Sequence, residues 1–293
     1  MSNIVLAVHG GAGTPKAPLD EPSFHRGVAA ALRAGHAILA GGGSAIDAVQ
    51  SAVLALEGDA IFNAGRGAVL NEAGDVEHDA ALMCGRPARA GSVAAVTGIR
   101  NPIRLAREVY EDGRHVMLAG AGAEEFAAER GLERVEPEFH AAGSPAEEWK
   151  EAAGDTVGAV ALDASGALAA ATSTGGIRGK RRGRVGDCPV IGAGTWADGH
   201  CAVSASGEGE AIMRVAAAHD ISRLVAYKRL PLEDACNEVV HKRVEGEIGV
   251  IAIDRSCEVA LSFNCGLFHR GVIYSDGLPL TAVGPGEPTA VAD

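Results

Sequence analysis

Four short runs in the second half of the chain combine hydroxyl, charged and glycine residues in patterns that could support hydrolysis. They span residues 154–158, 172–176, 183–187 and 204–209. Each run alone has an ordinary structural explanation: a threonine opening a strand, a turn, a surface ion pair or a helix cap. Their occurrence together, downstream of one linker-like segment, favours a shared chemical role.

Thr156 is the residue on which such chemistry would centre. An internal threonine hydroxyl is a poor nucleophile because no base takes its proton. If the chain were cut between Asp155 and Thr156, the new α-amine, with an ordinary pKa of ~7.7–8.0, would supply that base. The sequence therefore suggests a threonine nucleophile at a new N-terminus.

The other runs contain the groups that a nucleophile of this kind needs. The Thr174 hydroxyl can orient it, and the Ser206 hydroxyl and Gly207 N–H, which we expect at a helix start, can stabilise an oxyanion. Arg184 can make paired hydrogen bonds to a carboxylate, and Asp187 can receive an ammonium group. The last two would select the α-amino acid end of a substrate.

The elements that must position these residues alternate between helix pairs and strand hairpins. This order favours an α+β fold with two packed sheets and helices outside them. We expect the HGGAG run at 9–13 to be a loop and 131–155, rich in Glu, Pro, Gly and Ser, to be a linker. Strands are predicted at 4–8, 76–83, 91–97, 116–119, 157–163, 168–173, 201–205, 248–254, 258–264 and 268–274, and helices at 23–40, 44–58, 101–111, 123–129, 208–228 and 232–244.

The composition excludes several classes of function. The chain has 293 residues, 47% of them hydrophobic, and a net charge of −12, which argues against an extensive nucleic-acid or polybasic membrane surface. No apolar run approaches the ~20 residues of a membrane span, and we expect no signal peptide. Six cysteines at irregular spacing predict reduced thiols in the cytoplasm. No zinc-ligand spacing is present, so no catalytic cofactor is expected.

Seven segments carry a resemblance to a known family. They are HGGAG at 9–13, FNAGRG at 62–67, TVGAVALD at 156–163, ATSTGG at 171–176, GRVGD at 183–187, IGAGTWAD at 191–198 and SGEGE at 206–210. In this order they make the chain resemble the plant-type L-asparaginase and isoaspartyl aminopeptidase family of N-terminal-nucleophile hydrolases. The resemblance covers nearly the whole chain except 131–155.

The resemblance implies a fold and an assembly. It implies a single domain over 1–293 that forms a four-layer αββα sandwich. It also implies self-cleavage between Asp155 and Thr156, giving an α subunit of 1–155 and a β subunit of 156–293. Two such αβ units would form a dimer, that is, a heterotetramer.

The resemblance also implies roles for particular residues. Thr156 matches the family nucleophile, Thr174 the threonine that supports it, and Asn63 an asparagine near it. Ser206 and Gly207 match the oxyanion pair, although the family more often has threonine in place of the serine.

Substrate and ion sites are implied in the same way. Arg184 and Asp187 match the clamp on the substrate's α-carboxylate and α-amine, with Gly209 as a further contact. The 56–66 loop is similar to the family's structural sodium loop, and oxygen-only ligation suits a hard cation. Its implied ligands are the backbone carbonyls of Leu56, Glu57, Asp59, Phe62, Ala64 and Arg66. A tight glycine turn without an ion is the alternative for this loop.

The implied activity is hydrolysis of L-asparagine and of β-aspartyl dipeptides to L-aspartate. Two departures from the family pattern matter: Asp155 stands where this branch commonly has glycine, and Arg66 where the family often has an aliphatic residue. Asp155 is similar to the residue in the glycosylasparaginase branch, so that activity is one alternative. The other is a scaffold that never cleaves itself and binds small amino acids.

Overall fold

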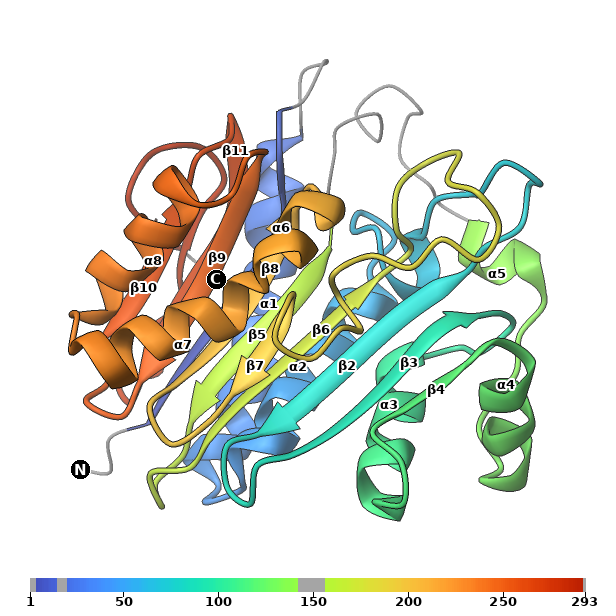
Figure 1. The fold of residues 1–293 in the computed structure, drawn as a ribbon, viewed down its shortest axis with the longest axis horizontal. Coiled ribbons are helices and arrows are strands. Elements are labelled where there is room, and N and C mark those ends of the chain that lie inside the picture. Colours follow the sequence, from blue (N-terminus) through green and yellow to red (C-terminus); the bar gives the residue numbers. More distant parts are fainter. Residues whose placement is uncertain (1–3, 15–19, 142–155, 292–293) are drawn as a thin grey trace.

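The chain forms two β-sheets that pack against each other, and helices pack against the sheets (Figure 1). The computed structural model describes residues 4–14, 20–141 and 156–291. The prediction of an α+β fold is confirmed, because both kinds of element are present and nearly all strand pairs are antiparallel.

Within the described residues, the larger sheet has nine strands in the order β13-β12-β11-β1-β5-β6-β2-β3-β4. Only the β3–β4 pair among these neighbours in the described chain is parallel. The strands are β1 Val5–Gly13, β2 His78–Cys84, β3 Arg89–Val96, β4 Met117–Ala119, β5 Val157–Leu162, β6 Leu168–Thr174, β11 Leu267–Tyr274, β12 Leu280–Ala282 and β13 Thr289–Ala290.

The smaller sheet has the order β10-β9-β8-β7 and is antiparallel throughout. Its strands are β7 Thr195–Ala197, β8 Cys201–Gly207, β9 Ile248–Asp254 and β10 Val259–Phe263. β8 and β9 lie against β1, β5 and β6, so the two sheets face each other.

Both faces of the larger sheet are buried, which explains why its central strands are mainly apolar. In β1, Leu6 and Val8 belong to the core beneath the N-terminal helices, whereas Val5 and Ala7 belong to the core between the sheets. Successive side chains of a strand point to opposite faces, so a strand covered on both sides favours apolar residues throughout. Its buried polar side chains, such as His9 and Thr174, make hydrogen bonds.

Helices cover the outer face of each sheet. α1 and α2 lie behind β1, β5 and β6, while α7 and α8 lie in front of β8 and β9 (Figure 1). The helices are α1 Glu21–Ala40, α2 Ala45–Gly58, α3 Pro102–Asp112, α4 Gly120–Glu129, α5 Pro137–Ala141, α6 Gly209–Val215, α7 Ala217–Lys228 and α8 Leu232–Lys242, with a 3₁₀ turn η1 at Gly65–Gly67.

Local sequence explains how α1 and α2 begin and pack. The predicted cap of α2 is confirmed, since the Ser44 hydroxyl accepts a hydrogen bond from Asp47 N. Gly35 lets the helices approach closely, because a Cβ there would lie 2.8 Å from Ala48 O.

Four predictions about elements are wrong. The HGGAG run is not a loop: β1 continues through it, pairing with β11 across a register shift between His9 and Gly11. The helix expected over 208–228 is two helices, because Ala216 adopts a left-handed conformation with φ of 50°. The strand over 268–274 is not the last, because β12 and β13 follow it, and the expected linker contains α5.

The described residues bear on the predictions about membrane-spanning segments and about the cysteines. None of the helices in that part of the chain has both the length and the apolar character needed to cross a membrane. None of the six cysteines forms a disulfide within the described residues, and the reduced state of these thiols stays a prediction.

Candidate active site

Thr156 and Thr174 meet because of the β5–β6 hairpin. Thr156 directly precedes β5 and is buried, and Thr174 is the last residue of β6. The hairpin register pairs Val157 with Ser173, so the residues before and after this pair lie side by side. The Thr156 hydroxyl donates to Thr174 Oγ1 at 3.1 Å. The two residues predicted to act together are therefore in direct contact.

Ser206 approaches the same point from the other sheet. It is the next-to-last residue of β8, and its Oγ accepts hydrogen bonds from Thr156 N at 3.3 Å and from Ala12 N at 3.1 Å. We call Thr156, Thr174 and Ser206 the hydroxyl cluster. It lies between the two sheets, at the ends of three strands.

The prediction that Ser206 and Gly207 start a helix is wrong. They end β8, and α6 begins at Gly209 with Glu208 as its cap residue. Gly207 has a φ of 139°, and a Cβ there would collide with the Glu247 carbonyl oxygen. Only glycine fits this position, because both the backbone conformation and the space exclude a side chain.

Asn63 reaches the cluster through the turn after β6. Its Nδ2 donates to Gly176 O at 2.7 Å, and its backbone oxygen accepts from Gly175 N at 2.9 Å. Gly176 N in turn donates to Thr174 Oγ1 at 2.9 Å. Asn63 therefore stabilises the turn whose Gly176 N–H binds the Thr174 hydroxyl.

Arg184 and Asp187, predicted to bind substrate, converge at Gly209. A Cβ on Gly209 would lie 2.9 Å from Asp187 Oδ1 and 3.0 Å from Arg184 Nη2. A side chain at that position would fill the space between the two charged groups. Glycine therefore keeps open the gap in which a small zwitterion could lie.

The two charged groups differ in how their hydrogen bonds are satisfied. Arg184 binds Glu210 with two parallel hydrogen bonds, Nε–Oε1 at 2.9 Å and Nη2–Oε2 at 2.8 Å. Asp187 is buried, and its Oδ2 has no hydrogen-bond partner among the described residues. Burial raises the pKa of the Asp187 carboxyl to about 7. Glu210, inside the SGEGE segment, was not singled out from the sequence.

A buried network that sequence reasoning missed runs behind Thr156. His9 Nε2 lies 2.8 Å from Ser204 Oγ, which lies 2.8 Å from Thr172 Oγ1. Thr195 continues the chain by donating to Thr172 Oγ1 at 2.6 Å. Burial lowers the pKa of His9 to about 3, opposed by a hydrogen bond with the Thr156 backbone. The imidazole is therefore neutral at physiological pH and helps to fix the start of β5.

The 56–66 loop offers oxygen atoms but no cluster of charged metal ligands. Among the described residues, no group of three or more His, Cys, Asp or Glu side chains is placed to hold a metal ion. Backbone carbonyls pack closely against the glycines of this region: a Cβ on Gly65 would lie 2.5 Å from Glu57 O, and one on Gly67 would meet Phe62 O. Oxygen donors of this kind fit a hard cation such as sodium.

The carbonyls of this loop are only partly occupied by hydrogen bonds. Leu56 O accepts from Asp59 N at 3.2 Å, Asp59 O from Phe62 N at 3.2 Å, and Ala64 O from Gly67 N at 3.3 Å. A carbonyl oxygen has two lone pairs, so each can still face an ion.

The Glu57 side chain has a different role from its carbonyl. It is buried and accepts hydrogen bonds from Ser173 Oγ at 2.7 Å and Ile103 N at 3.0 Å. Burial raises the pKa of this carboxyl to about 7.

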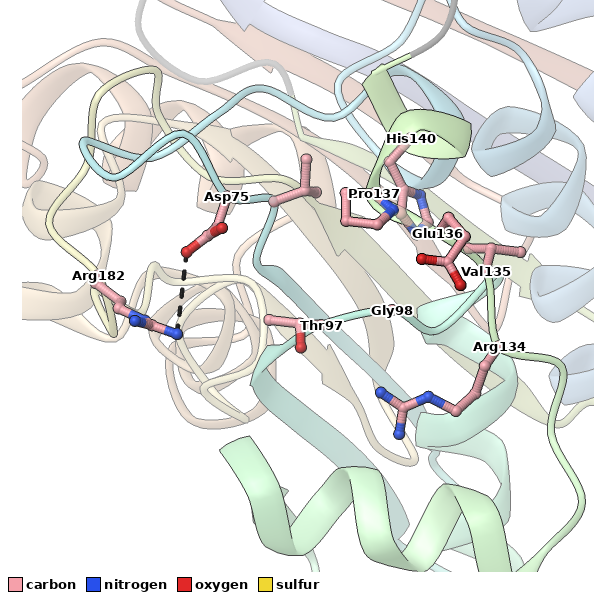
Figure 2. Close-up of a pocket in the computed structure, with 10 residues that line it drawn as sticks. Asp75, Thr97, Gly98, Arg134, Val135, Glu136, Pro137, His140 and Arg182 are labelled. Carbon is pink, nitrogen blue, oxygen red and sulfur yellow. Dashed lines mark ion pairs between the residues drawn. The ribbon is translucent and has the colours of Figure 1, made fainter.

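A cavity of about 330 Å³ lies beside α5, and neither the hydroxyl cluster nor the clamp residues line it (Figure 2). Arg134, Arg182 and His140 are among its lining residues, and none of the predicted site residues lines it. His140 Nδ1 lies 2.9 Å from Gly65 O, so α5 is fastened to the 56–66 loop. The predicted cleavage partner Asp155 and the rest of 142–155 lie outside the described residues.

Known proteins match the chain over most of its length. The family model described as Asparaginase matches residues 2–155 and 150–283. The isoaspartyl peptidase of Escherichia coli is 42% identical over 97% of this chain and 97% of its own. The isoaspartyl peptidase/L-asparaginase of Homo sapiens is 42% identical over 87% of this chain and 88% of its own, and that of Danio rerio 41% over 93% and 96%. The chain therefore belongs to the asparaginase family.

Proposed function

We propose that this protein is a hydrolase that cleaves the side-chain amide of L-asparagine and the isopeptide bond of β-aspartyl dipeptides, releasing L-aspartate. The names of its relatives support this substrate class. The single observation that carries the proposal is the position of Thr156: its amide nitrogen faces Ser206 and its hydroxyl faces Thr174.

The proposed active form is made by self-cleavage between Asp155 and Thr156. Subunits 1–155 and 156–293 would stay together as one domain, since β5 lies between β1 and β6 in the larger sheet. We propose that the sheets and their helices form the αββα sandwich of N-terminal-nucleophile hydrolases, and that two αβ units assemble as a dimer.

In the proposed reaction, Thr156 Oγ attacks the substrate's amide carbonyl while the free Thr156 amine accepts the hydroxyl proton. The Ser206 hydroxyl and Gly207 N–H stabilise the oxyanion. The Thr156 amine then gives the proton it accepted to the leaving nitrogen, and ammonia or an amino acid departs. Water then attacks the acyl-enzyme, which releases L-aspartate and restores the Thr156 hydroxyl.

The proposed clamp selects the α-amino acid end of the substrate. Arg184 uses Nε and Nη2 for Glu210, so Nη1 is available to the α-carboxylate. The unpartnered Oδ2 of Asp187 receives the ammonium group. Gly209 leaves the space between them.

We further propose that the carbonyls of Leu56, Glu57, Asp59, Phe62, Ala64 and Arg66 hold a structural sodium ion that takes no part in the chemistry. Sodium should then raise the unfolding temperature more than an equal concentration of tetramethylammonium, measured by calorimetry. Equal unfolding temperatures would favour the tight turn without an ion.

N-terminal sequencing of the purified protein tests the central proposal. Two sequences are expected, one from the chain start and one beginning at Thr156. A single full-length chain that hydrolyses L-asparagine would contradict the mechanism, and an inert full-length chain would favour the amino-acid-binding scaffold.

Asp155 supports one second candidate, glycosylasparaginase activity. Assays with β-aspartyl-leucine and with asparagine-linked N-acetylglucosamine separate the two. We expect the dipeptide to be the better substrate, and the opposite order would favour glycosylasparaginase.

A further inference from the structure

Three buried charged residues lie beneath the loop that carries the proposed clamp. Glu77 precedes β2, Asp79 is its second residue, and Lys180 lies in the segment after β6. Their relative exposures are 4%, 0% and 3%. Charged side chains are rarely buried this deeply unless they are paired. We call these residues the buried triad, and residues 183–187 the clamp loop.

The two carboxylates of the triad hold the backbone of the clamp loop. Glu77 Oε1 accepts a hydrogen bond from Gly183 N at 2.9 Å, and Asp79 Oδ2 accepts one from Gly186 N at 3.1 Å. These amides flank Arg184 on its two sides. The carboxylates therefore fix the stretch of backbone from which the Arg184 side chain extends.

The Asp79 carboxylate is also anchored to the body of the larger sheet. Asp79 Oδ1 accepts from Ala95 N at 2.9 Å, at the irregular pairing of β2 with β3. Asp79 also lies opposite Thr174 in the β2–β6 register. The clamp loop is thus tied to the strand position that faces the hydroxyl cluster.

Lys180 connects the triad to the turn beside Thr174. Its Nζ donates to Glu77 O at 2.9 Å. A Cβ on Gly176 would lie 2.9 Å from the same Nζ, so the ammonium lies against this turn, whose N–H donates to Thr174 Oγ1. Burial lowers the pKa of Lys180, while attraction to Asp79 and Glu77 opposes that effect. The ammonium therefore makes its hydrogen bond to the Glu77 backbone and is attracted to the two carboxylates of the triad.

We propose that the buried triad positions the clamp loop relative to Thr174, so that a substrate held by its α-amino acid end presents its amide to the nucleophile. The inference rests on the proposed function. The triad residues are positioning residues, because they act through the loop and the turn.

The test compares a substrate that has the α-amine recognised by Asp187 with one that lacks it. Succinamate has the amide and a carboxylate of L-asparagine but lacks the α-amine. A misplacement of about 1 Å can lower a rate on the order of a hundredfold. We expect Lys180→Met and Asp79→Asn to lower kcat/KM for L-asparagine by about ten- to a hundredfold, mainly through KM. We also expect them to reduce the preference over succinamate by about tenfold.

Two further variants separate positioning from general stability. Lys180→Arg keeps the charge and should recover part of the preference. Arg223→Met removes a part-buried arginine that binds Asp198 and serves as the matched control, which should lower the unfolding temperature without changing the preference. Where Lys180→Met does not fold, Asp79→Asn carries the test, because it nearly preserves shape.

Calorimetric binding of L-aspartate and succinate to fully cleaved protein gives a readout that needs no turnover. A loss of L-aspartate binding that exceeds the loss of succinate binding supports the inference, because succinate shares the carboxylate bound by Arg184 but lacks the ammonium bound by Asp187. If wild type hydrolyses L-asparagine and the triad variants keep its preference, the triad has only a structural role. If wild type neither cleaves itself nor hydrolyses L-asparagine, the proposed function itself fails.

Discussion

The hydroxyl cluster and the clamp loop lie close together but are built differently. The cluster comes from residues at the ends of paired strands, where the β ladder fixes each backbone position. The clamp loop has no such ladder, and buried carboxylates hold its amides instead. The sheet therefore supplies the reacting groups with rigid geometry, whereas recognition depends on side chains that hold an irregular loop.

Replacing Thr156 with Ala should have the largest effect. It removes the proposed nucleophile, so chain cleavage should stop and turnover should fall at least about a thousandfold. Thr156→Ser, which keeps a hydroxyl, should retain some cleavage. A denaturing gel and an ammonia-release assay measure both. If the Ala variant stayed uncut but remained active, the hydroxyl cluster could no longer be the source of the reacting groups.

Replacing Arg184 with Ala should affect binding without stopping cleavage. Loss of one partner of a charge-assisted pair amounts to about 2–5 kcal/mol, or roughly 30-fold to several thousandfold in kcat/KM. Arg181→Ala in the same segment serves as the control. Steady-state kinetics on fully cleaved protein would count against the clamp if KM and kcat stayed unchanged.

The Asp187 carboxyl should make recognition depend on pH. Because burial raises its pKa to about 7, it is mostly protonated at pH 6 and mostly ionised at pH 8. Only the ionised form attracts the ligand's ammonium, so the inhibition constant of L-aspartate should fall about tenfold over this range. Succinate, which lacks the amine, and Asp187→Asn should both show a flat profile.

The same shift has an opposite consequence for stability. A carboxyl whose pKa is raised on folding binds its proton more tightly in the folded state. It therefore stabilises the fold at low pH, and this contribution diminishes as the pH rises from about 4 towards 7. In denaturant titrations, the free energy of unfolding of wild type should therefore fall across that range. Asp187→Asn, which has no carboxyl to ionise, should lack this part of the fall.

The smallest effect is expected outside both regions. Ser44→Ala removes the cap of α2 and should lower the free energy of unfolding by about 1 kcal/mol. Activity should stay at the wild-type level. A large loss of activity in this variant would mean that the hydroxyl cluster depends on the helix layer as well as on the strands.

Much of this arrangement could be predicted from local sequence. The strands predicted at 157–163 and 168–173 are separated by only a few residues, which favours a hairpin, and the pairing of β5 with β6 brings Thr156 to Thr174. The element order was enough for an α+β fold. The HGGAG run was misjudged because its glycines allow close packing inside a strand, which from sequence cannot be distinguished from a loop.

Other features depended on contacts between distant segments. The SGEGE segment was recognised, but the pairing of Glu210 with Arg184 joins the first turn of α6 to the clamp loop, which lies far from it in the sequence. The buried triad spans about a hundred residues of sequence, and its members have no local pattern in common. The break at Ala216 also follows from tertiary packing, because alanine favours the helix interior.

The sequence by itself determined the chemical groups and their order along the chain, because hydroxyl, guanidinium and carboxylate types are fixed by residue identity. It also determined the paired strands around Thr156, since hairpin pairing is local. Only the tertiary structure decided that Ser206 and Asp79 accept hydrogen bonds, and that Asp187 Oδ2 has no partner among the described residues. That outcome depends on burial and on the approach of the two sheets, which no single segment specifies.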